Sequence, residues 1–168
     1  MPKGVLLVNL GSPDSFEVKD IKRYLKEFLM DERVIDYPYW LRYLIVRGII
    51  LNVRPPKTSE AYKKIWWDEG SPLIVISKRL TAKVQAQVSV PVVMAMRYGN
   101  PSISEGLAAL HKQGVTEVLL IPLYPQYAMA TSETIEVLAE KLIREHKWCY
   151  ISSPLSFTAK NTSRLLLA

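Results

Sequence analysis

The sequence has very few of the side chains that build covalent or metal-bound frameworks. Its 168 residues include one cysteine, Cys149, so an internal disulfide is excluded, which favours a reducing compartment. The two histidines, His111 and His146, each lie in a helical pattern and precede a lysine, with no second ligand nearby. Such histidines are typical of surface positions. The sequence therefore shows neither a metal-ligand cluster nor a nucleophilic triad.

Long apolar runs and nucleotide-binding glycine patterns are missing as well. No stretch of about 18 consecutive apolar residues occurs, so no membrane span is expected. The apolar run near the start of the sequence is too short for the core of a signal peptide, and we expect a cytoplasmic protein. Residues 10–13, LGSP, match neither the GxGxxG pattern nor the P-loop pattern, so a tight turn before a helix is the simpler interpretation.

What the sequence does contain is a regular alternation of apolar runs and amphipathic stretches. The apolar runs predict strands at 4–10, 91–98, 116–123 and 147–152. Capping residues and apolar periodicity predict helices at about 15–29, 72–88, 102–114 and 131–146. Strands that alternate with helices predict an α/β fold, with a parallel sheet and helices on both of its faces.

Loops rich in glycine, proline and tyrosine follow three of these strands, at residues 10–13, 97–101 and 122–127. The carboxyl ends of parallel strands lie at one edge of the sheet, where α/β proteins bind ligands, so the three loops should converge. Arg97 ends an otherwise apolar strand, and we expect it either to point into a cleft or to pair with a buried acid. In the third loop, prolines stiffen the chain and Tyr127 offers a flat, partly polar face.

Residues 37–67 interrupt the alternation with a segment that is both apolar and basic. Its first part predicts a helix at about 39–51, which is too short and too basic to span a bilayer. Four interpretations are open: a surface helix that dips into lipid, a lip over an apolar ligand, a subunit contact, or a core helix with two snorkelling arginines. A connection of this length is usually functional or lid-like.

The net charge of +6 is concentrated in the same part of the chain. Residues 38–67 contain six basic side chains and one acidic side chain, Glu60. This patch suits a carboxylated or phosphorylated small molecule, nucleic acid or an acidic membrane surface, unless it is simply a solvated face. Arg54 and Lys57 lie on a proline-stiffened segment and are suited to bind carboxylates, the alternative being an exposed linker.

Four segments carry a family resemblance. In chain order they are VNLGSPDSFEVKDIKRYLKEFLMDERVID, RPPKTSEAYKKIWWDEGSPL, MRYGNPSI and LLIPLYPQYAMATSET. Their order and spacing over about residues 3–150 resemble the N-terminal half of ferrochelatases. The resemblance implies a doubly wound, four-stranded parallel sheet with flanking helices, one of two chelatase-like, Rossmann-like halves with a porphyrin cleft between them. It also implies a lyase of heme biosynthesis that inserts Fe²⁺ into protoporphyrin IX to make protoheme.

The resemblance also implies roles for individual residues. The porphyrin-binding residues that it implies are Leu10, Gly11, Ser12, Pro13, Arg54, Tyr62, Ser71, Arg97, Tyr98 and Tyr127. Among them, Arg54 would meet a propionate, with Ser71 as a second hydrogen-bonding group. Arg97 and Tyr98 would lie on the floor of the cleft. The helix at about 39–51 resembles the hydrophobic lip of the family, which implies contact with a membrane surface.

Two positions depart from patterns that some family members show. Met129 stands where those members carry a cysteine that binds an iron–sulfur cluster, so no cluster is expected in this half. Asp14 stands where others have a tyrosine, which points to the protoporphyrin-using branch. The family's metal-facing histidine and its later glutamate have no counterpart in this sequence. No catalytic or metal-binding residue is therefore assigned, and we expect the chain to be inactive alone.

The expected organisation is a ferrochelatase N-terminal domain over 1–152, with the lip insertion at about 37–67, followed by a tail at 153–168 of no assigned function. The expected partners are protoporphyrin IX and Fe²⁺ as substrates, without a resident cofactor, and either the C-terminal half or a second copy over exposed apolar surface. A porphyrin- or heme-binding module without catalysis is the alternative. A basic scaffold for membranes or nucleic acid is disfavoured, and no nucleic acid is expected.

Overall fold

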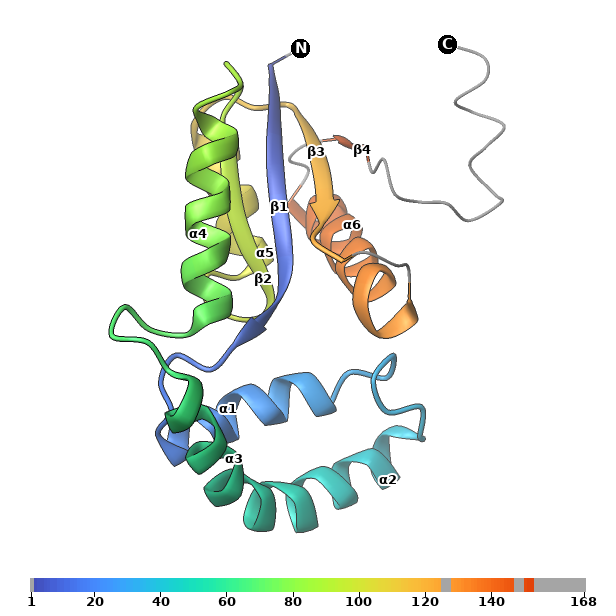
Figure 1. Cartoon of the computed structure of the whole chain (residues 1–168). Helices are drawn as coiled ribbons and strands as arrows, with labels where there is room; N and C mark the ends of the chain where they lie inside the picture. Colours follow the sequence, from blue (N-terminus) through green and yellow to red (C-terminus); the bar gives the residue numbers. More distant parts are fainter. Residues whose placement is uncertain (1, 125–127, 147–149, 153–168) are drawn as a thin grey trace.

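The computed structural model describes residues 2–124, 128–146 and 150–152 (Figure 1). Its core is a parallel sheet in which β1 (Lys3–Ser12) lies between β2 (Val92–Gly99) and β3 (Glu117–Pro122). A short strand, β4 (Tyr150–Ser152), pairs in parallel with β3 on its outer side. The predicted α/β class, with a parallel sheet, is confirmed.

Helices flank the sheet on both sides. In Figure 1, α4 (Pro72–Gln85) lies over one face, and α5 (Ile103–Lys112) and α6 (Thr134–His146) lie over the other. Side chains of β1 alternate between the two sides: Leu6 packs in the cluster formed with α5 and α6, whereas the Asn9 amide donates a hydrogen bond to Ser77 on α4. The connections that follow β1 and β3 therefore run over opposite faces of the sheet. Folds of this kind bind ligands beyond the carboxyl ends of two strands whose connections separate in this way.

The larger core cluster lies between the sheet and helices α5 and α6. Its buried members are Leu6, Val8, Ala95, Ile103, Leu107, Leu110, Val115, Val118, Leu120, Ile135 and Ala139. The start of α5 is held by the predicted capping box, in which the Ser102 hydroxyl accepts from the Glu105 amide and the Glu105 carboxylate accepts from the Ser102 amide. This cluster makes the sheet a rigid support for the loops at its carboxyl edge.

A second cluster lies beyond the carboxyl ends of the strands, around α1 (Val18–Leu29). Its buried members are Ile21, Tyr24, Leu25, Leu29, Val46 and Tyr98. The helix begins later than predicted, because the Ser15 hydroxyl accepts a hydrogen bond from the Glu17 amide and donates one to Asp20 instead of capping a longer helix. Tyr98, near the end of β2, ties this cluster to the sheet.

The basic insertion is one helical arm made of α2 (Tyr39–Tyr43), a π-helical turn η1 (Leu44–Ile50) and α3 (Leu51–Ile65). The helix predicted at about 39–51 is confirmed, but it continues through two prolines to residue 65 instead of giving way to a proline-stiffened segment. The Asn52 amide donates to the carbonyls of Arg47 and Gly48, which satisfies acceptors beside the irregular turn. Within the described residues, no helix is long and apolar enough to cross a membrane.

Candidate functional site

The loops after β1 and β2 are locked together at the strand tips. Gly11 pairs with Tyr98 in the sheet register and has a φ of +111°. A Cβ atom at Gly11 would lie 1.7 Å from the Tyr98 carbonyl oxygen, so the position needs glycine both for its backbone angle and for this close approach. The predicted convergence of the first two loops is confirmed, and the third begins where β3 ends beside β1.

Four tyrosines from four different elements surround the space beyond these tips. They are Tyr24 on α1, Tyr62 on α3, Tyr98 on β2 and Tyr124 after β3. The Tyr24 hydroxyl donates to the Gly11 carbonyl at 3.4 Å. Burial raises the pKa of Tyr24, and the other three tyrosines raise it further. Burial likewise raises the pKa of Tyr98 to about 12, so these phenols stay neutral at physiological pH.

Two of the phenols, those of Tyr62 and Tyr124, have surroundings that suit contact with a bound molecule. Burial raises the pKa of Tyr62, although the Ser12 hydroxyl acts in the opposite direction, which places Tyr62 beside the first loop. The Tyr124 hydroxyl is buried and has no hydrogen-bond partner among the residues that the structure describes. A buried hydroxyl without a partner costs about 1–3 kcal/mol, so Tyr124 is a candidate donor or acceptor for a bound molecule.

Asp31, in the turn after α1, is the hub of a buried polar network. Its Oδ2 atom accepts hydrogen bonds from Arg97 at 2.5 Å, from the Tyr98 hydroxyl at 2.9 Å and from the Thr134 hydroxyl at 2.5 Å. Its Oδ1 atom accepts from the Arg33 amide at 2.9 Å. Burial acts to raise the pKa of Asp31, but hydrogen bonds from Thr134, Arg33 and Tyr98, together with the charge of Arg97, lower it overall.

The network decides between the two predicted roles of Arg97. The guanidinium pairs with a buried acid, Asp31, and its Nε also donates to the hydroxyl and the carbonyl of Thr134 at 2.7 and 3.1 Å. Its side chain is only 15% exposed and lies 4.4 Å from the centre of the Tyr98 ring. Sequence reasoning missed Asp31. One signal was available: Asp31 follows an amphipathic helix almost directly, and Arg97 near the end of a strand needs an acidic partner.

Arg54 and Lys57 present their charges on the outer side of α3. They border an open groove of about 550 Å³, lined by Arg54, Lys57, Thr58, Ala61, Tyr62 and Ile65. Among the described residues, no acidic side chain forms an ion pair with either cation, whereas Lys63 on the same helix pairs with Glu60 at 3.0 Å. The groove therefore combines two available cations with a neutral phenol and aliphatic carbon.

The helical arm is also the most apolar exposed surface of the described chain. Its exposed large side chains are Tyr39, Trp40, Tyr43, Leu44, Ile49, Val53 and Ile65. The interpretation as a core helix applies to Val46, which is buried, but Arg42 does not snorkel: it is buried and donates to the carbonyls of Ile35 and Tyr37, while the exposed Arg47 donates to the Tyr43 hydroxyl. These seven side chains face solvent and are available to lipid, to a ligand or to another chain, whereas Val46 of the same arm is buried in the second cluster.

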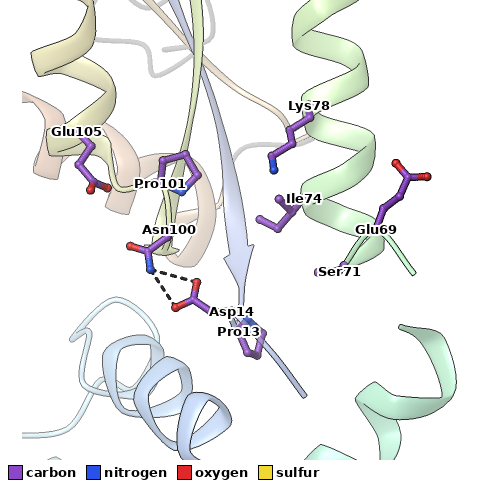
Figure 2. Close-up of a pocket in the computed structure, with 10 residues that line it drawn as sticks. Pro13, Asp14, Glu69, Ser71, Ile74, Lys78, Asn100, Pro101 and Glu105 are labelled. Atoms are coloured by element: carbon purple, nitrogen blue, oxygen red, sulfur yellow. Dashed lines mark hydrogen bonds between the residues drawn. The ribbon is translucent and has the colours of Figure 1, made fainter. Parts of the chain in front are cut away.

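A second hollow, of about 380 Å³, lies between the tip of β1, the start of α4 and the loop after β2 (Figure 2). Pro13 and Ser71 line it, with Lys78 reaching in from α4. The Asp14 carboxylate accepts two hydrogen bonds from the Asn100 amide, at 2.9 and 3.1 Å, which Figure 2 shows, and also pairs with Arg23. Asp14 thus joins the first two loops, and its charge is already balanced.

The predicted site residues accordingly fall into three groups. Leu10, Gly11, Ser12, Tyr62 and Tyr98 lie together beyond the strand tips, and Tyr62 also borders the groove that carries Arg54. Pro13 and Ser71 border the second hollow, so Ser71 and Arg54 line different depressions, and their joint contact with one ligand stays a prediction. Arg97 is paired within the network.

Two further positions named in the sequence can be placed only in part. Tyr127 lies outside the described residues. Met129 is exposed at the start of η2 (Met129–Glu133), the π-helical turn that precedes α6. No group of three or more histidine, cysteine or acidic side chains is placed to hold a metal ion in the part of the chain that the structure describes.

Comparison with known proteins identifies the relatives of this chain. The protein-family model named Ferrochelatase matches residues 2–156. A ferrochelatase of Stutzerimonas stutzeri is 51% identical over 145 residues, which are 86% of this chain and 42% of that protein. Ferrochelatases of Vibrio atlanticus and Photobacterium profundum are 46% and 48% identical, over 79% of this chain. The chain thus spans about two fifths of the length of the curated relatives it matches.

Proposed function

The chain belongs to the ferrochelatase family, and we propose that it is the porphyrin-binding N-terminal half of an enzyme that inserts Fe²⁺ into protoporphyrin IX to make protoheme. In this proposal the sheet is one of two chelatase-like, Rossmann-like halves, doubly wound and four-stranded once β4 is counted. The observation that supports the proposal best is the groove on α3. There, two cations that have no acidic partner among the described residues adjoin a neutral tyrosine beside the strand-tip loops.

A porphyrin is a flat apolar ring with carboxylates along one edge, and the described residues match both parts. Arg54 and Lys57 would bind the carboxylates, because a guanidinium and an ammonium donate charge-assisted hydrogen bonds to such groups. Leu10 and Tyr62 would contact the ring, and the absence of a side chain at Gly11 allows the ring to approach the backbone. Tyr127 would lie against the ring, as the family resemblance implies.

The helical arm would guide an apolar ligand into this half-site. Its exposed tyrosine, tryptophan and aliphatic side chains lie beside basic residues, a combination that suits the interface of an anionic membrane. An apolar porphyrin partitions into lipid, so an arm that contacts the membrane shortens its path to the groove. We therefore propose a protein that acts at the membrane surface without a spanning helix in its described part.

This half would bind and orient the porphyrin without exchanging protons with it. The carboxylate of Asp31 is engaged by four donors, and the buried phenols have raised pKa values, so neither is suited to accept a pyrrole proton near neutral pH. Proton acceptance and metal guidance would fall to the family's histidine and glutamate, which this sequence lacks. We propose that the chain binds porphyrin but is inactive alone, and that no iron–sulfur cluster forms through Met129.

The first test is a spectroscopic titration of protoporphyrin IX with the 168-residue chain, followed by addition of Zn²⁺ or Fe²⁺. We expect a shifted porphyrin absorption band and no metal insertion above the protein-free rate. Turnover would refute the proposal that this half is inactive alone. A spectrum that stays unchanged at high protein concentration would refute porphyrin binding itself. The alternative of a non-catalytic porphyrin module would be favoured if the C-terminal half of a relative also failed to restore turnover.

A matched pair of variants tests the proposed carboxylate contact. Arg54→Gln removes a cation that borders the groove, and Lys64→Gln removes an exposed cation of the same helix that does not border it. We expect the first to weaken protoporphyrin binding about tenfold, the loss of one charge-assisted hydrogen bond, and the second to change it less than about twofold. Equal effects would show that the patch acts only through its overall charge.

A further inference from the structure

The polar network around Asp31 has a charge balance that the proposed function leaves unexplained. Arg97 pairs with Asp31, and Arg33 pairs with Glu133 at 3.3 Å beside it. The four side chains come from the turn after α1, from β2 and from the turn before α6, so three separate elements meet here. Each of the two pairs is neutral, and the more exposed Glu32 also pairs with Arg33 at 3.2 Å, so Asp31 is the acid that the structure pairs with Arg97.

Burial makes the balance depend on Asp31 in particular. The Asp31 and Arg97 side chains are 7% and 15% exposed, so solvent screens their charges only weakly. Thr134 and Tyr98 donate neutral hydrogen bonds to the same carboxylate and cannot replace its charge. Without Asp31, the end of β2 would carry a guanidinium that has lost its acidic partner among the described residues, on a different element from the cations of α3.

We propose that Asp31 is a specificity-determining residue of this half-site, which neutralises Arg97 and so confines the recognition of ligand carboxylates to Arg54 and Lys57 on α3. The inference rests on the proposed porphyrin binding. It concerns the number of carboxylates that the ligand carries, because in porphyrins with four carboxylates the two additional groups replace apolar substituents on the opposite edge of the ring. A neutral floor accepts the apolar edge, whereas an uncompensated arginine would favour the carboxylated one.

The test is a charge-exchange cycle on the full 168-residue chain, read as the ratio of two dissociation constants. Fluorescence quenching would measure binding of protoporphyrin IX, with two carboxylates, and of coproporphyrin III, with four. Asp31→Asn should shift the ratio about fivefold toward coproporphyrin, which corresponds to about 1 kcal/mol of attraction between the unpaired guanidinium and a ligand carboxylate. Arg97→Gln leaves Asp31 unpaired and should shift the ratio in the opposite direction.

Two further variants separate charge from folding. Asp31→Glu keeps the charge and should keep the wild-type ratio, and the double variant Asp31→Asn/Arg97→Gln restores neutrality and should return the ratio to within about twofold of wild type. A general loss of structure would weaken both porphyrins together and leave their ratio unchanged. Circular dichroism and thermal melting of each variant would identify such a loss independently.

The outcomes distinguish this inference from the function on which it rests. Opposite shifts in the two single variants, cancelled in the double variant, would support the role of Asp31. Binding of both porphyrins by wild type, with one ratio common to all variants, would overturn the inference and leave the proposed function intact. Failure of the wild-type chain to bind either porphyrin would overturn the proposed function and this inference with it.

Discussion

Replacement of Gly11 by alanine should be the most damaging single-methyl change at the strand tips. The backbone there has a φ of +111°, and placing an L-residue in that region costs about 1–2 kcal/mol. The new Cβ would also lie 1.7 Å from the Tyr98 carbonyl oxygen, so two paired strands must separate. Forced overpacking of this kind adds roughly 1–3 kcal/mol, which gives a total of about 2–5 kcal/mol.

Gly70 provides the matched control for this prediction. Its φ is +119°, close to that of Gly11, but a Cβ there would meet nothing within 4 Å. Gly70→Ala should therefore cost only the conformational part, about 1–2 kcal/mol. The measurement is the free energy of unfolding from urea denaturation followed by circular dichroism. Equal costs for the two substitutions would show that the close approach to Tyr98 does not constrain the loop.

Three further predictions concern the network, the fold and the arm. The folded-state pKa of Asp31 is lowered, so its contribution to stability is complete above its unfolded pKa of about 3.9 and is lost as the pH falls through the folded value. In urea titrations at several pH values, Asp31→Asn should flatten this decline of the unfolding free energy at acid pH. An identical pH profile for the variant and the wild type would refute the lowered pKa of Asp31. Glu105→Ala breaks the capping box and should lower the free energy of unfolding by about 1 kcal/mol, whereas Glu145→Ala near the end of α6 should change it by less than about 0.5 kcal/mol. Trp40→Ser in the arm should reduce the amount of protein that sediments with anionic lipid vesicles severalfold, whereas Ile76→Ser, which removes an exposed apolar side chain from α4, should not. Equal sedimentation of the two variants would exclude the arm as the surface that contacts the membrane.

The parts of the fold that follow from local patterns were predictable from the sequence. The strand at 4–10 and the capping box at 102–105 depend on residues within a few positions of one another, so periodicity and capping chemistry were sufficient. The arm was predicted only in its first half. Prolines normally end a helix, and the Asn52 hydrogen bonds that accompany its continuation depend on three-dimensional geometry.

The site was predicted less completely, because its polar contacts span long distances in the sequence. Asp31 meets Arg97 and Thr134 across 66 and 103 positions, and no short motif announces such a pairing. Sequence reasoning left two roles open for Arg97, and only the position of the carboxylate decides between them. The continuation of the helix to Ile65 was not foreseen either, and it places Arg54 in a different depression from the one that Ser71 lines; their roles toward a ligand stay predictions.

In the proposed function, the distribution of charge would let one wall of a cleft orient a flat ligand before a second wall closes over it. Arg54 and Lys57 on α3 have no acidic partner within the described part of the chain, whereas Asp31 pairs with Arg97, and Glu32 and Glu133 pair with Arg33. A ring with carboxylates on one edge gains charge-assisted hydrogen bonds in a single orientation and loses them when turned around. A floor without net charge also avoids the repulsion that a buried guanidinium would impose on an arriving divalent cation. Under this proposal the Asp31–Arg97 pair would serve both substrates: it would favour one orientation of the ring and would keep the approach to the ring's centre free of positive charge.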